Sequence, residues 1–167
     1  MELRHHAPFT PHSLPSRLYF FLLLTSHFSL PMSSSLRHAS LVWKHDLVFE
    51  GGVPGGPAIL LDGDGGAGPS PVVALLLAAA ACTGADVVLI LNKMRTGLSG
   101  LRIEARGTRR EQDPKRYTAL HFIFHVSGAA IDEARARRAI DLSITKYCSV
   151  MHSLAPEIAI TYALVLG

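Results

Sequence analysis

The feature that most constrains this chain is the segment PVVALLLAAAACTGADVVLILNKMR, residues 71–95, which is apolar on nearly all sides as far as Asn92. Ser70 is a good helix N-cap, and Pro71 suits the first helical position because the N–H that proline lacks would have no partner there. At ~1.5 Å per residue such a helix is roughly 35 Å long, and one that is apolar all round belongs in a core. We therefore expect a long buried helix with one thiol, Cys82, near its centre.

The composition favours one globular domain with a real core. The chain has 167 residues, of which 49% are hydrophobic and 17% charged, and this is too short a chain to favour two domains. The net charge is +3, but no block of like charges occurs and the aromatic residues, at 7%, do not alternate with basic ones. Nucleic-acid binding is therefore not indicated.

The first 39 residues differ from the rest, with a single acidic residue, Glu2, and one continuous apolar run at residues 18–24. That run is too short to span a bilayer. It would suit the apolar part of a signal peptide, and its flanks would suit a transit peptide, but no small-x-small cleavage site stands out. We interpret residues 1–39 as a disordered or misassigned extension, with Met32 as an alternative start, and residues 40–167 as the folded domain.

Short apolar runs bounded by turn residues predict five strands. They cover residues 40–50, 57–62, 101–108, 117–127 and 157–166. The fourth alternates regularly, with Leu120, Phe122, Phe124 and Val126 on one face, as expected for a strand with one buried side. His121 and His125 fall on its other face, and no Cys, Asp or Glu adjoins them at metal-ligand spacing. A solvated or partner-covered face is the preferred interpretation.

A second helix is predicted from Glu133 to about Leu154, capped by Asp132. Its apolar stripe recurs every three or four residues. The stripe consists of Ala136, Ile140, Ile144, Cys148 and Met151. The order β-β-α-β-β-α-β follows, an α+β fold with the helices on one side of a sheet.

Gly63, Gly65 and Gly68 spell the dinucleotide fingerprint G-x-G-x-x-G. In a dinucleotide-binding unit the helix opens within the glycines, and a strand follows some twenty residues on. Here two prolines interrupt the turn and the next strand begins only near Leu101. A flexible glycine loop is favoured, and the sequence indicates neither a cofactor nor a metal site.

Cys82 and Cys148 are the only cysteines, and both fall on helix faces that point inward. They are either two inert buried thiols or one spatial pair. Asp86 lies one turn from Cys82, so this apolar helix face carries a polar group that needs a partner or a cleft. Paired thiols suit peroxide chemistry, since attack on an O–O bond leaves a sulfenic acid that a second thiol condenses to a disulfide.

Three segments resemble the OsmC/Ohr family of osmotically induced and organic-hydroperoxide-resistance proteins, in its OsmC-like branch. GPSPVVALLLAAAACTGADVVLILNKMR resembles the family's central helix. The strand that follows in this branch is resembled by EQDPKRYTALHFIFHVSG. The branch's second cysteine helix is resembled by RRAIDLSITKYCSVMHSLAPEIAITYAL. The resemblance runs from about Val42 to Leu166.

The resemblance implies a role for each thiol, with Cys82 as the peroxidatic cysteine and Cys148 as the resolving cysteine. It also implies an intertwined, cytoplasmic homodimer with the thiols at the interface. Such a protein reduces organic hydroperoxides and takes electrons from a lipoyl-type dithiol. The alternative is a non-catalytic dimer that binds an apolar small molecule in the interface cleft.

The sequence departs from the family at the two residues that activate the thiol. The arginine of the N-terminal strand region is absent, with Lys44 and His45 nearby, and Val72 and Val73 occupy the place of a glutamate. Without a cation, an apolar setting raises the pKa of a thiol. A compensating cation would have to come from Arg102, Arg106 or a partner chain.

Overall fold

The computed structural model describes residues 35–167, and residues 38–167 form one compact unit. Residues 18–24 and Met32, which the sequence singled out, lie outside the described range. One sheet has the order β1-β2-β3 and is antiparallel, with β1 Ser40–His45, β2 Val48–Gly52 and β3 Ala58–Asp62. The other has the order β4-β5-β6, with β4 Leu98–Arg109, β5 Tyr117–Gly128 and β6 Ala159–Leu166. In this second sheet β4 runs antiparallel to β5, and β6 runs parallel to β5.

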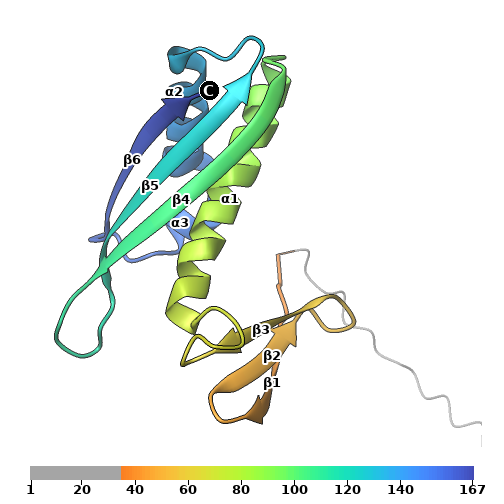
Figure 1. Cartoon of the computed structure of the whole chain (residues 1–167), viewed down its shortest axis with the longest axis vertical. Coiled ribbons are helices and arrows are strands. Elements are labelled where there is room, and N and C mark those ends of the chain that lie inside the picture. Colours follow the sequence, from red (N-terminus) through yellow and green to blue (C-terminus); the bar gives the residue numbers. More distant parts are fainter. Residues whose placement is uncertain (1–34) are drawn as a thin grey trace, which may run out of the picture. The chain divides into compact units, whose positions relative to one another are not determined.

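The helices are α1 Pro71–Lys93, α2 Glu133–Leu142, a π-helical turn Ser143–Tyr147 and α3 Ser149–His152. Figure 1 shows α1 and α2 behind the sheet formed by β4, β5 and β6, so both lie on the same side of it. The predicted α+β class, with helices on one side of a sheet, is confirmed.

The prediction of a single strand over residues 40–50 is wrong, because this stretch is the hairpin of β1 and β2. The chain turns at Asp46, whose φ of 41° is in the left-handed region. Aspartate tolerates that conformation better than most residues. The indole N–H of Trp43 donates to the Asp46 carbonyl over 2.9 Å, which also fixes the turn. Three strands therefore precede α1 instead of two.

The start of α1 is as predicted, and its end comes slightly earlier. The Ser70 hydroxyl accepts a hydrogen bond from the N–H of Val73, and Pro71 occupies the first turn. The helix ends at Lys93, and Arg95 beyond it has a φ of 56°. Arg95, the last residue of the predicted helical segment 71–95, therefore lies outside the helix.

One side of α1 packs on the second sheet. The buried residues of the helix are Ala79, Ala80, Thr83, Gly84, Val87 and Leu91. Gly84 permits the close approach, since a Cβ atom there would lie 2.9 Å from Cδ1 of Ile103 on β4. The alternation predicted for β5 is confirmed, because Leu120, Phe122, Phe124 and Val126 are all buried. Phe122 and Phe124 form the centre of this core.

The opposite side of α1 is open, which corrects the expectation of a helix buried all round. Leu75, Leu77 and Leu89 are 43%, 52% and 68% exposed. By length and composition α1 could cross a membrane, with a mean hydropathy of 2.3 over a window that is 28% buried. Its packing on β4, however, is also that of a core helix. An exposed apolar face of this kind normally marks a surface covered by a partner.

The predicted continuous helix over residues 133–154 is wrong, because it breaks at Cys148. The N–H of Cys148 donates to the Ser143 carbonyl, five residues back, over 2.9 Å. Cys148 itself is extended, with φ −69° and ψ 101°. The Thr145 hydroxyl donates to the Asp141 carbonyl, a type of side-chain bond that bends helices. Cys148 therefore stands at a break in the backbone and caps α3.

Candidate thiol site

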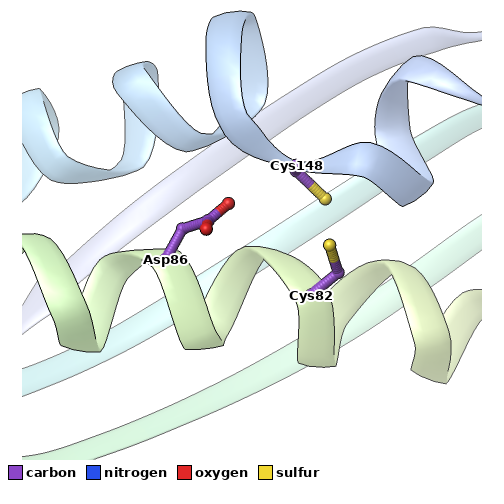
Figure 2. Close-up of side chains that lie close together, drawn as sticks. All are labelled: Cys82, Asp86 and Cys148. Atoms are coloured by element: carbon purple, nitrogen blue, oxygen red, sulfur yellow. The ribbon is translucent and has the colours of Figure 1, made fainter. Parts of the chain in front are cut away.

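Cys82, Asp86 and Cys148 form one cluster, in which the two Sγ atoms and a carboxylate oxygen all lie within 4.8 Å of one another. Figure 2 shows Cys82 and Asp86 one turn apart on α1, with Cys148 facing them from the break before α3. The sulfur atoms point toward each other in this view. Both thiols are free. The structure thus brings together the two cysteines that the sequence left as either a pair or two separate thiols.

Cys148 is fully buried, at 0% exposed. Burial raises the pKa of the Cys148 thiol, and a hydrogen bond from the Thr83 hydroxyl to its sulfur, over 3.4 Å, works against that rise. The neighbouring Cys82 raises the pKa further, whereas a bond from the Met151 N–H over 3.5 Å lowers it. The thiolate of Cys148 therefore has two donors available but no exposure to water.

Cys82 has a different setting, because it is half-buried and lies in the regular part of α1. Its neighbour in sequence, Thr83, faces inward and is fully buried. The thiol of Cys82 is the more accessible of the two. Asp86 is also half-buried, so the cluster is partly exposed on this side.

Asp86 is held by a residue that the sequence did not reveal. The Ser143 hydroxyl, fully buried at the start of the π-helical turn, donates to Oδ2 of Asp86 over 2.8 Å. The sequence indicated that Asp86 needed a partner, and this is the partner. The sequence did not identify three residues of the site, namely Ser143, Thr83 and Met151. The one available signal was that Thr83 adjoins Cys82 in the chain.

Arg102 and Arg106, two of the possible sources of a compensating cation, do not enter the cluster. Both pair with Glu104, with N–O distances of 2.6 and 3.7 Å. Along β4, Leu101 and Ile103 face the core, so the residues that alternate with them face away from α1. Neither arginine is therefore in place to stabilise a thiolate at Cys82.

The other polar features noted in the sequence do not converge on a common centre. Nδ1 of His121 lies 2.8 Å from the Thr161 hydroxyl, whereas Nε2 of His125 lies 3.0 Å from the Glu104 carboxylate. The two histidines thus have separate partners.

The glycine loop after β3 is organised by Asp62. Its buried carboxylate accepts hydrogen bonds from the backbone N–H groups of Asp64, Gly66 and Ala67 at 2.8–2.9 Å. These three bonds hold the pKa of Asp62 below its usual range. The N–H groups that would hold a phosphate in a dinucleotide-binding loop are thus used within the chain.

Comparison with known proteins gives a consistent result. Residues 63–163 match the family described as OsmC-like protein. The protein YhfA of Escherichia coli K12 is 37% identical over 126 residues, which are 75% of this chain and 94% of YhfA.

Two solved structures share the fold. An OsmC-like protein from Mycoplasma pneumoniae has a TM-score of 0.70 at 18% identity, over 80% of this chain and 99% of its own. The organic hydroperoxide resistance protein OhrB of Bacillus subtilis has a TM-score of 0.55 at 12% identity, over 77% of this chain and 98% of its own.

Proposed function

The chain belongs to the OsmC-like family, and on that premise we propose that it is a two-cysteine thiol peroxidase that reduces organic hydroperoxides. The observation that carries the proposal is the distance of at most 4.8 Å between the sulfur atoms of Cys82 and Cys148. The fold shared with OhrB, a protein named for resistance to organic hydroperoxides, supports it. The difference in exposure between the two thiols supports separate roles for them.

Cys82 is the attacking residue in this proposal, because it is the thiol that an external hydroperoxide can reach. Its thiolate attacks the terminal oxygen of ROOH, the O–O bond breaks, and the alkoxide leaves and takes up a proton to become ROH. The sulfur is oxidised to a sulfenic acid. The two electrons of this step come from the thiolate.

Cys148 is the resolving residue. Its thiolate attacks the sulfenic sulfur of Cys82, the S–O bond breaks, and hydroxide leaves and is protonated to water. The hydrogen bonds from Thr83 and Met151 to Sγ of Cys148 favour the thiolate that this step requires. A dithiol of the lipoyl type then reduces the disulfide by thiol exchange and is itself oxidised to a disulfide.

A homodimer is part of the proposal. A second copy would cover two exposed apolar surfaces. One is formed by the exposed leucines of α1, and the other by exposed apolar residues of the first sheet, among them Trp43 at 63% and Ile59 at 60%. We also place the protein in the cytosol, where thiols stay reduced between turnovers. Sedimentation of the reduced protein should give the mass of two chains.

A second candidate is a non-catalytic protein that binds an apolar small molecule. It is favoured by a pocket of about 470 Å³ beside the start of α1, lined by Val72, Leu75, Tyr117, Leu154 and Ile158 among others. The two candidate functions can be separated by the rate at which Cys82 is alkylated at neutral pH. This rate is measured in a Cys148→Ser protein, in which Cys82 is the one remaining thiol. A peroxidase requires a rate above that of free cysteine, and a binding protein does not.

The direct test is the consumption of cumene or linoleic hydroperoxide by metal-free, reduced protein in a stopped-flow instrument. We expect reaction well above that of free cysteine, and loss of this excess in Cys82→Ser. A rate equal to that of free cysteine, or one unchanged by Cys82→Ser, contradicts the proposal.

A further inference from the structure

The thiol cluster also has the composition of a metal site. Within residues 35–167, Cys82, Asp86 and Cys148 are the one group of three or more Cys, His, Asp or Glu side chains whose ligand atoms come close enough to hold an ion. The sequence did not indicate this, because the ligands come from two distant segments with no zinc-motif spacing. Thiolate sulfur combined with one carboxylate oxygen is a donor set that suits Zn²⁺.

We propose that the reduced protein binds one Zn²⁺ through Sγ of Cys82, Sγ of Cys148 and one carboxylate oxygen of Asp86, with the fourth position open. Zinc bonds of about 2.3 Å to sulfur and 2.0–2.2 Å to oxygen place tetrahedral ligand atoms roughly 3.5–3.8 Å apart. The three atoms in this structure are already within 4.8 Å of one another. Contraction by about 1 Å, within the range of side-chain rotation, completes the geometry.

The groups around the cluster fit this role. The Ser143 hydroxyl binds Oδ2 of Asp86, which orients the carboxylate and leaves its other oxygen for the metal. The Thr83 hydroxyl and the Met151 N–H both donate to Sγ of Cys148. Hydrogen bonds of this kind orient metal ligands and stabilise their charge. The half-buried Cys82 and Asp86 provide the side from which an ion can enter.

Zinc binding does not depend on the peroxidase proposal, although it uses the same thiols. The ion binds two thiolates, so two thiol protons are released to solvent, and no electron is transferred. A disulfide between Cys82 and Cys148 would remove both sulfur ligands. The zinc-bound form and the disulfide form therefore exclude each other, and formation of the disulfide would release the ion.

The test uses Co²⁺ as a coloured substitute for Zn²⁺ on the full, reduced chain. We expect one Co²⁺ per chain, with thiolate-to-cobalt charge-transfer absorption and the visible bands of tetrahedral cobalt. One equivalent of Zn²⁺ should displace them, and oxidation to the disulfide should prevent them from forming. Cobalt binding without thiolate absorption would overturn the proposal.

Asp86→Asn is the decisive variant, because it keeps the shape of the side chain and removes the carboxylate. We expect the zinc affinity to fall at least about 100-fold, the upper range for loss of a supporting group. Asp64→Asn is the matched control, since Asp64 is exposed on the glycine loop, and its affinity should not change. Equal affinities in both variants would refute the role of Asp86.

Cys82→Ser gives an independent check if Asp86→Asn fails to fold, and should reduce the charge-transfer intensity by about half. The zinc site and the peroxidase activity can be tested separately. If the protein shows the thiolate-to-cobalt bands but reacts with hydroperoxide no faster than free cysteine, the zinc site is supported and the peroxidase proposal is not. If the protein turns over hydroperoxide but binds no cobalt, the peroxidase proposal is supported and the zinc site is refuted.

Discussion

Cys82 and Cys148 are the same chemical group in two different backbone settings. Cys82 lies in the uninterrupted helix α1 and is half-buried, whereas Cys148 stands at a break between two helical segments and is 0% exposed. The break allows a backbone N–H, that of Met151, to reach the sulfur of Cys148. Cys82, in the regular helix, stays partly exposed. The difference teaches that backbone geometry can give two thiols of one cluster different exposure and different hydrogen-bond donors.

Removing the buried thiol should give the largest effect and test the proposed division of roles most directly. In Cys148→Ser, the first oxidation of Cys82 should persist, while steady-state turnover with a dithiol falls at least about 100-fold because no resolving thiol remains. Mass spectrometry after dimedone trapping should find the sulfenic acid on Cys82. If Cys148→Ser turned over normally, the assigned roles would be wrong.

Ser143→Ala should destabilise the Cys82 side of the cluster. It removes the buried hydroxyl that donates to Asp86, and a hydrogen bond to a charged group contributes about 1.5–3 kcal/mol. Asp86 is half-buried and can recover water, so we expect a loss of about 1.5 kcal/mol in unfolding free energy, measured with urea. Ser153→Ala, at an exposed position, is the control and should cost under about 0.5 kcal/mol.

Thr83→Val should affect the thiol of Cys148 alone. The Thr83 hydroxyl bond lowers the pKa of Cys148, so its loss should raise that pKa further. We expect disulfide formation to slow by about threefold to tenfold, as for the loss of one hydrogen bond, while the initial oxidation of Cys82 keeps its rate. Rapid-quench analysis of both steps measures this. Thr118→Val, at an exposed position on β5, should change neither step, and an equal slowing of both steps would count against this assignment.

The pH dependence of stability should give the smallest effect. The pKa of Cys148 is raised by folding, so the folded state holds this proton more tightly than the unfolded state. The corresponding stability is complete below the unfolded thiol pKa of about 8.5 and declines above it, by less than about 1.4 kcal/mol per pH unit. Urea unfolding of reduced protein between neutral and alkaline pH measures the decline. Cys148→Ser should remove it and Cys82→Ser should retain most of it.

The sequence by itself determined the elements whose signals are local. The caps at Ser70 and Asp132 are both seen, because a side chain that bonds a backbone N–H three residues on needs no distant partner. The alternation in β5 correctly identified its buried face, since the period of a strand is fixed by its geometry. Sequence patterns also placed both cysteines on inward positions.

Only the tertiary structure decided the features on which the site depends. A break at Cys148 replaced the predicted continuous helix, and Ser143, five residues before it, bonds Asp86 on α1, a contact that no local pattern encodes. The open side of α1 was likewise hidden, since an all-apolar helix has no periodicity to show which face is covered. The sequence thus identified the two thiols and the helix that carries Cys82. The tertiary contacts decided how close the sulfurs come, which one is open to solvent and what holds the carboxylate beside them, because these properties depend on residues far apart in the chain.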